Sequence, residues 1–324
     1  MEEILSKFKG SAVGPAIGAA LGKAAEFVPQ DKVFEYYGRP ITKMEKPHPS
    51  SPYDYLKPQE VPASVELFKL ALESLVENKG FDPYDFIARV AQWVGSTEVH
   101  KYLEPVILNM TRAILEGAPL EEVNRRTVSI DAILHTSAMG IYHFDNPVVA
   151  AEGAKVMATL FAQGREVEEG AQILGATVSM LIDGDYDLGE KEEKKRFIDE
   201  LIEYCPELSI APRYLKAVKE KLDENITLGD AIKIFGNGEY IFEAIPLALF
   251  IFLKDAQYPQ KALLNAVNAY GEMGGATSAL GFMVGQWIGA YWGIEIFPPE
   301  WKEEVQHGKE LERLAEELYK ILFE

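Results

Sequence analysis

Apolar residues recur every three or four positions along most of the chain, which is the period of a helix with one buried face. The chain contains no convincing run of alternating apolar and polar residues, the pattern of a half-buried strand. The sequence therefore predicts an all-α fold, and the lack of repeats or linker-like stretches predicts one domain over residues 1–324. The helices expected from this pattern span residues 65–76, 84–94, 103–116, 132–142, 147–162, 167–182, 191–204, 212–222, 240–254, 259–270 and 299–322.

Two columns of glycines at four-residue spacing lie near the two ends of the chain. Each column falls in a run that otherwise resembles a helix, where a glycine costs about 1 kcal/mol relative to alanine. Residues four apart share one helix face, so each column is a bare stripe along which another backbone can approach closely. We therefore expect two central helices that line a crowded, buried site. The columns are Gly10, Gly14, Gly18 and Gly22, and Gly281, Gly285, Gly289 and Gly293.

Two segments have more than one interpretation. Met273–Ile294 carries no charge, as in a membrane-spanning helix, but its glycine pair and polar residues lower its hydropathy, so a buried core helix is favoured. Residues 37–62 form a long polar connection whose prolines prevent a continuous helix. Connections of this length are usually lids or mobile segments, and we expect a functional role for this one.

Composition narrows the choice of partners. Of the 324 residues, 48% are hydrophobic and 26% are charged, which is ordinary for a globular protein. The formal net charge of −19 repels phosphate backbones and anionic lipid, so we expect neither nucleic acid nor a membrane as partner. A single cysteine, Cys205, and a start without an apolar leader predict a cytoplasmic protein. Frequent Glu and Lys suggest a thermophilic source.

Common catalytic motifs are missing from the sequence. The five histidines form no i, i+4 pair of the kind found in zinc sites, and no nucleophile elbow, phosphate loop or dinucleotide motif occurs in its proper context. Cys205 has no histidine nearby and is interpreted as a semi-buried thiol. Asp183, Asp185 and Asp187 alternate as in the first half of a calcium loop, but the later glycine and glutamate are missing. A solvated acidic turn is the default there, with calcium binding as the alternative.

The glycine columns belong to longer motifs that carry a resemblance. Residues 10–27, GSAVGPAIGAALGKAAEF, resemble the opening motif of the ADP-ribosylglycohydrolase family. Residues 265–293, NAVNAYGEMGGATSALGFMVGQWIGAYWG, resemble its closing motif, and residues 67–93 and 236–253 resemble helices between them. The resemblance covers nearly the whole chain in the same order, and it implies an orthogonal multi-helix bundle of that family's type.

The same resemblance implies a particular chemistry. Members of this family hydrolyse a glycosidic bond at the anomeric carbon of ADP-ribose with two magnesium or manganese ions, which aspartates from three motifs hold. Carried over, those aspartates fall on Ala19, Ala63, Ser64, Ala276 and Ser278. Hard dications need several oxygen ligands, including carboxylates, so we expect no metal, no cofactor and no metal-dependent hydrolysis.

Some acidic residues remain near the implied cleft. Glu26 matches a glutamate that the family retains, and it acts either as a general base or as a helix-end carboxylate that caps a loop. Glu272, Asp131 and His135 could join it in an acid–base set, or each could be hydrogen-bonded separately. The residues expected to line the cleft besides Glu26 and Glu272 are Ala19, Ala63, Ser64, Asp131, His135, Gly274, Gly275, Ala276, Thr277 and Ser278.

Three functions remain open on this basis. The first is a pseudoenzyme that binds an ADP-ribosyl or nucleotide-like ligand in the remnant cleft. The second is a metal-independent hydrolase of an ADP-ribose-type bond that uses Glu26 and Glu272. The third is a structural, crystallin-like protein whose cleft is filled by side chains such as Phe27, Phe68 or Trp287. An open acidic cleft favours the hydrolase, an open neutral cleft favours the binding protein, and a closed cleft favours the structural role.

Overall fold

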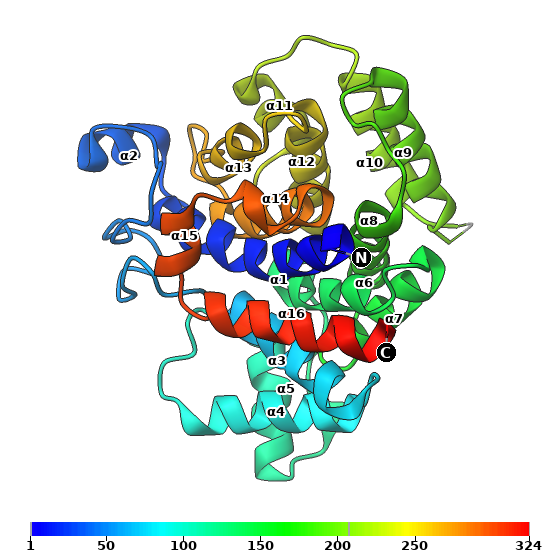
Figure 1. Cartoon of the computed structure of the whole chain (residues 1–324). Helices are drawn as coiled ribbons and strands as arrows, with labels where there is room; N and C mark the ends of the chain where they lie inside the picture. Colours follow the sequence, from blue (N-terminus) through cyan, green and yellow to red (C-terminus); the bar gives the residue numbers. More distant parts are fainter. Residues whose placement is uncertain (1, 207, 324) are drawn as a thin grey trace.

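A computed structural model of the chain describes residues 2–206 and 208–323. The described residues form sixteen α-helices and five short 3₁₀-helices, and their β-type contacts are isolated bridges (Figure 1). The predicted all-α class is therefore confirmed. The helices are α1 (Glu2–Gly22), η1 (Lys23–Ala25), α2 (Gln30–Tyr37), α3 (Ala63–Asn78), α4 (Pro83–Ser96), α5 (Pro105–Glu116), η2 (Leu120–Glu122), η3 (Ile130–Ala132), η4 (Leu134–Ser137), α6 (Ala138–Tyr142), α7 (Pro147–Thr159), α8 (Arg165–Asp183), α9 (Lys191–Glu203), α10 (Ala211–Lys221), α11 (Leu228–Phe235), α12 (Ile241–Lys254), α13 (Pro259–Val267), α14 (Thr277–Trp292), η5 (Ile294–Ile296), α15 (Pro299–Glu304) and α16 (Gly308–Phe323).

Helices α1 and α14 lie side by side at the centre and run in opposite directions (Figure 1). Their glycine columns face each other: a Cβ on Gly18 would lie 1.8 Å from the carbonyl oxygen of Gly281, and one on Gly14 would lie 2.1 Å from that of Gly285. Neither helix could carry side chains along this line. The predicted close pair of central helices is confirmed, except that Gly293 ends α14 with a φ of +87° instead of continuing it.

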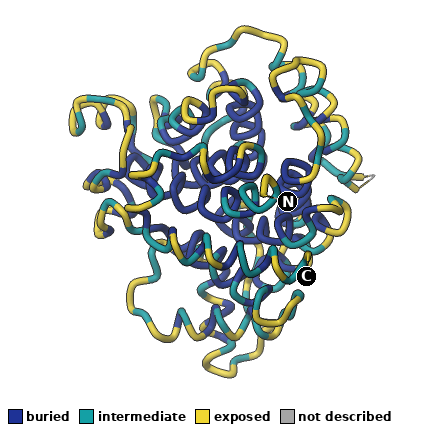
Figure 2. Tube along the Cα trace, viewed as in Figure 1, coloured by how far each residue is buried: buried dark blue, intermediate teal, exposed yellow. Residues whose placement is uncertain are grey.

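Other helices cover this central pair. Helix α3 contacts α14 through Phe68, whose ring lies 5.5 Å from that of Phe282. Helix α16 covers the outer face of α1, where Lys9 forms ion pairs with Glu312 and Glu316. Figure 2 shows the buried residues concentrated around α1, α14 and their neighbours, with exposed residues on the outer helices and loops. None of the described helices combines the length and apolar content that crossing a bilayer requires.

Two predicted helices are wrong in detail. The segment 132–142 is mostly 3₁₀-helix, and only Ala138–Tyr142 is α-helical, because the backbone before it pairs with a distant segment: Ile130 N donates to Glu239 O at 2.8 Å. The segment 299–322 breaks between α15 and α16, where His307 has a φ of +66° and Gln306 N donates to Gln59 O at 3.0 Å. In both cases a long-range backbone contact overrides the local helical pattern.

Candidate functional site

Glu26 lies where the end of α1 meets the beginning of α14. Its side chain is fully buried, and its Oε2 accepts hydrogen bonds from the backbone N–H of Ser278 at 2.6 Å and from the Thr277 hydroxyl at 3.2 Å. The carboxylate therefore caps the first turn of α14, where unpaired N–H groups favour negative charge. Burial, and next the nearby Asp131 carboxylate, raise the pKa of Glu26 well above its usual value.

The glycine pair before α14 shapes the loop that meets Glu26. Gly274 has a φ of +85°, and a Cβ there would lie 2.5 Å from the backbone carbonyl of Phe27. Phe27 N donates to Gly275 O at 2.9 Å, and Ala276 N donates to Asn237 O at 2.8 Å. Only glycine fits at position 274, where φ is positive and the Phe27 backbone is close, so this turn holds the loop before α14 against the segment after η1.

The long connection over residues 38–62 covers this region. Its Tyr53 is only 1% exposed, and the pKa of the Tyr53 hydroxyl is raised by burial and by the Asp131 and Glu26 carboxylates. The segment is held in place by Lys23, a fully buried lysine whose Nζ donates to Ala20 O at 3.0 Å and Pro58 O at 2.5 Å. Burial lowers the pKa of Lys23 to about 7. The connection is thus packed onto the end of α1 and closes the cleft above Glu26.

A small acidic pocket of about 190 Å³ lies beside the covered cleft. Backbone pairing of residues 128–130 with 239–241 brings the neighbouring Asp131 next to Glu239, and Glu104 joins them because its Oε1 accepts from the Thr127 hydroxyl at 2.9 Å. Burial, followed by Glu239 and then Glu104, raises the pKa of Asp131 to about 8. The pocket is lined by Tyr102, Leu103, Glu104, Pro105, Asp131 and Glu239.

Tyr102 lies at the edge of this pocket on a strained loop. Lys101 and Tyr102 have φ values of +47° and +59°, in the left-handed region that non-glycine residues rarely adopt. The Tyr102 ring lies 5.5 Å from the Tyr53 ring and 6.4 Å from the Phe27 ring. Sequence reasoning missed Tyr53, Tyr102, Glu104 and Glu239, because no local pattern marks a contact between segments so far apart.

Comparison with known proteins shows which family the chain resembles over its whole length. The sequence model of the ADP-ribosylglycohydrolase family matches residues 1–323. The chain belongs to this family. It is 24% identical over 322 residues to an uncharacterized protein of Archaeoglobus fulgidus, which covers 99% of this chain and 97% of that one.

The relatives whose names state a function either have lower identity to this chain than the Archaeoglobus protein or match only part of it. ADP-ribosylarginine hydrolase Tri1 of Pseudomonas putida is 22% identical over 326 residues, 98% of this chain and 79% of Tri1. Human ADP-ribosylhydrolase ARH3 is 29% identical over 118 residues, which is only 33% of this chain and 31% of ARH3. A solved chain titled "ADP-ribosylglycohydrolase-related protein complex" has the same fold, with a TM-score of 0.68, 19% identity and 99% coverage of both chains.

The residues present do not fit the two metal ions that membership of the ADP-ribosylglycohydrolase family implies. Ala19, Ala63 and Ala276 carry no donor atom, and Ser64 and Ser278 offer only hydroxyls. All five positions are buried and provide no charge to hold a dication. Across residues 2–206 and 208–323, no three His, Cys, Asp or Glu side chains are grouped closely enough to hold a metal, and this includes the acidic turn at residues 183–187.

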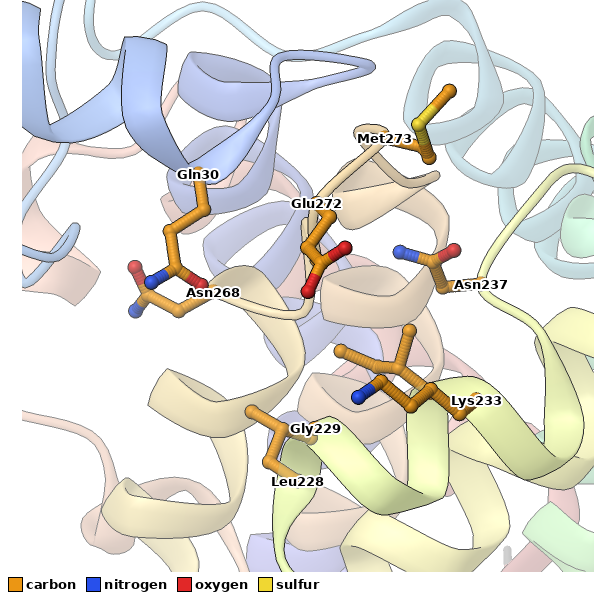
Figure 3. A pocket seen from close by; sticks show the side chains of 10 residues that line it. Gln30, Leu228, Gly229, Lys233, Asn237, Asn268, Glu272 and Met273 are labelled. Carbon is orange, nitrogen blue, oxygen red and sulfur yellow. The ribbon is translucent and has the colours of Figure 1, made fainter.

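The structure separates two other residues from Glu26. Glu272 is exposed and lines a different pocket of about 460 Å³, where its carboxylate lies between Asn237 and the amides of Gln30 and Asn268 (Figure 3). His135 is 1% exposed, packs against the Phe86 ring at 5.5 Å, and has no hydrogen-bond partner on either ring nitrogen among the described residues. Burial lowers the pKa of His135 to about 3.

Of the predicted set, the structure therefore brings together Glu26, Asp131, Thr277 and Ser278. Asp131 is close enough to Glu26 to raise the pKa of Glu26, and Glu26 is hydrogen-bonded to Thr277 and Ser278 directly. The catalytic roles of Glu26 and Glu272 remain predictions. The cleft is covered, which by the criterion above favours the structural role, and the space that remains beside it is acidic, which favours the hydrolase. A bound partner is supported instead by the buried Glu26 Oε1, which has no hydrogen-bond partner among the described residues.

Proposed function

We propose that this chain is a member of the ADP-ribosylglycohydrolase family that has lost hydrolysis by two metal ions and keeps the cleft as a binding site for a ribosyl ligand. The observation that carries the proposal is the replacement of every expected metal-binding carboxylate by a small neutral residue, in a chain that keeps the fold of the family. Removing charge while keeping space disables metal binding without collapsing the helices around Gly18 and Gly281.

An unpaired polar atom supports a remaining binding role. Glu26 Oε1 is buried and has no hydrogen-bond partner among the described residues. Buried polar atoms are nearly always hydrogen-bonded in native proteins, so this oxygen calls for a polar partner such as a sugar hydroxyl or a bound water. Carboxylates commonly accept hydrogen bonds from ribose hydroxyls in nucleotide sites, and a ribosyl group therefore matches this unpaired acceptor.

The size and charge of the pocket limit which part of the ligand enters it. Ligand pockets for drug-sized molecules are usually at least about 300 Å³, and the acidic pocket offers about 190 Å³. For an ADP-ribosyl or nucleotide-like ligand, the neutral nucleoside part fits this acidic space better than the diphosphate does. Entry of a whole nucleotide requires the Tyr53 segment to move away from Glu26.

The test is calorimetric titration of the full chain with ADP-ribose, adenosine and ribose, with manganese or with a chelator, beside an assay for ADP-ribose release from an ADP-ribosylated arginine peptide. We expect binding that the chelator does not change, and no release. Metal-dependent release by the native chain would refute the loss of hydrolysis. Failure of all three ligands to bind would refute the binding role and support the structural, crystallin-like alternative.

A metal-independent hydrolase is the second candidate, with a different acid pair from the one that the sequence suggested. Glu272 lies in another pocket, whereas Asp131 is electrostatically coupled to Glu26 and has a pKa of about 8, so it holds a proton at neutral pH. Burial and Asp131 also raise the pKa of Glu26, and two neighbouring carboxyl groups with raised pKa values are suited to act as acid and base in turn in glycoside cleavage. Release of ADP-ribose in chelator that is abolished in both Glu26→Gln and Asp131→Asn would establish it.

A further inference from the structure

We propose that the pocket between α2, α11 and the loop before α14 binds a short peptide with free ends, whose ammonium group faces Glu272 and whose carboxylate faces Lys233. This pocket has a volume of about 460 Å³, and none of the described residues that line it also lines the acidic pocket. The inference goes beyond the proposed function and does not depend on it.

The loop wall of this pocket is held rigidly by hydrogen bonds from two sides. Gln30 N donates to Gly271 O at 2.9 Å, which ties the beginning of α2 to the loop. From the other side, Asn237 Nδ2 donates to Ala269 O at 2.8 Å and to Tyr270 O at 3.1 Å. A wall that is fixed before a ligand arrives loses less conformational entropy on binding, which favours affinity.

Two side chains of opposite charge line the pocket without being paired. Figure 3 shows Glu272 extending from the loop and Lys233 from α11 toward the same space. Within the part of the chain that the structure describes, neither charged group forms an ion pair or a hydrogen bond. Asp230 is near enough to Lys233 to be affected by its charge, but its carboxylate already accepts from Thr227 N at 2.9 Å and from the Thr227 hydroxyl at 2.6 Å. The two pocket charges are therefore available to a ligand.

The acidic side of the pocket extends toward α2. A second hollow of about 420 Å³ shares Gln30 and Glu272 with the first and is also lined by Asp31 and Phe34. Two carboxylates therefore lie on this side, whereas Lys233, the only lysine among the described residues that line either hollow, lies on α11. This separation of charge matches a dipolar ligand and gives it a direction, with its ammonium group toward α2 and its carboxylate toward α11.

The surfaces between the charged ends suit a peptide with apolar side chains. Leu228, Ile232 and Met273, which is 88% exposed, provide apolar surface. The side-chain amide of Gln30 makes no hydrogen bond to any described residue, and the Asn237 amide uses only its Nδ2. These amide groups can pair with the N–H and C=O groups of a peptide. A hollow of this size with apolar surface and a few fixed polar groups is typical of a ligand site.

The experiment compares leucyl-leucine with two analogues that each lack one charge, its N-acetyl derivative and its C-terminal amide. Calorimetric titrations of the full chain are run in low salt at about pH 6.5, where the amine of the peptide is protonated. We expect capping of either end to weaken binding about fivefold or more, because each cap removes one charge pair. The affinity of leucyl-leucine should also fall as salt is added.

The amide separates a local site from general electrostatic attraction. The net charge of −19 by itself favours the amide, which is a cation, over the dipolar peptide. Weaker binding of the amide than of leucyl-leucine therefore reports a positive group at the site, and Lys233 is the group that the pocket offers.

Two variants assign each end of the peptide. In Glu272→Gln, leucyl-leucine and its N-acetyl derivative should bind equally, while the amide still binds more weakly. In Lys233→Gln, leucyl-leucine and its amide should bind equally, while the N-acetyl derivative still binds more weakly. Both side chains are exposed, so the fold should not change, and circular dichroism checks this. Glu220→Gln and Lys216→Gln, at exposed positions of α10, are the matched controls and should leave all three affinities unchanged.

Equal affinity of the native chain for the free peptide and both capped forms would overturn the inference. An equal loss of affinity in the α10 controls and in the two pocket variants would overturn it as well. Failure of leucyl-leucine to bind would also refute the peptide site and would leave the ribosyl site standing, because Glu26 and its hydrogen-bond partners do not line this pocket.

Discussion

Replacing Gly18 by alanine tests the central helix pair directly. The added Cβ would lie 1.8 Å from the carbonyl oxygen of Gly281 and 2.4 Å from its carbonyl carbon. Contacts under 3.0 Å essentially never occur, so α1 and α14 would have to separate by about 1.2 Å (3.0 − 1.8) at this point. Both partners are backbone, and no change of rotamer can relieve the overlap.

The magnitude follows from two opposing effects. Overpacking a close-packed core typically costs about 1–3 kcal/mol, and a backbone clash that side chains cannot relieve belongs at the upper end. Alanine returns about 1 kcal/mol through its better helix propensity. The free energy of unfolding should therefore fall by about 2 kcal/mol. With an unfolding entropy of roughly 2.1 cal/mol/K per residue over 324 residues, the melting temperature should fall by about 3 °C.

Urea unfolding followed by circular dichroism at 25 °C measures this change, with Gly95→Ala as the control. Gly95 is also a helical glycine, in α4, but a Cβ there would lie 3.6 Å from Leu115, an ordinary contact. We expect the control to be neutral or up to about 1 kcal/mol more stable. If Gly18→Ala behaved like the control, the close approach of α1 and α14 would be refuted, and with it the packing reason for both glycine columns.

Three further changes probe the buried polar groups. Because Asp131 has a pKa near 8 when folded and near 3.8 when unfolded, stability should fall as pH rises from about 4 to 8, and urea midpoints of Asp131→Asn should fall less over that range. Burial holds the pKa of His135 at about 3, so the native chain should lose stability below pH 6.5, and His135→Leu should lose less in the same measurement. Glu26→Ala leaves the Ser278 N–H without an acceptor and should cost about 1–2 kcal/mol, whereas Glu26→Gln keeps an acceptor and should lose less on thermal unfolding. Equal pH profiles of variant and native chain, or equal loss in the two Glu26 variants, would contradict these assignments.

The parts of the fold that the sequence predicted well are those with a periodic signal. Four-residue spacing places Gly10, Gly14 and Gly18 on one face of α1, and the second glycine column forms a matching face on α14. Two such bare faces can pack closely only against each other, so the central pair followed from the spacing alone. Helix α11 was missed although it begins with a capping box, in which the Thr227 hydroxyl accepts from Asp230 N. That signal was available in the sequence, because Thr and Asp three residues apart precede an apolar run.

The candidate site was predictable only where it follows the two terminal motifs. The resemblance placed Glu26 beside Thr277 and Ser278, and the hydrogen bonds show that contact. The neighbours of Asp131 could not be predicted in this way, because they depend on backbone pairing with Glu239, 108 residues further along the chain (239 − 131). Sequence proximity also misplaced Glu272: glycines with positive φ on either side of it direct the chain toward another pocket.

The charge balance of the cleft connects these observations. The family resemblance implies aspartates that balance two dications, and in this chain neutral residues stand at those positions. The acids outside the metal set have no such compensation: Asp131, Glu104 and Glu239 still face a common pocket. A buried carboxylate without a cation binds a proton instead, which is what a pKa of about 8 means for Asp131 at neutral pH.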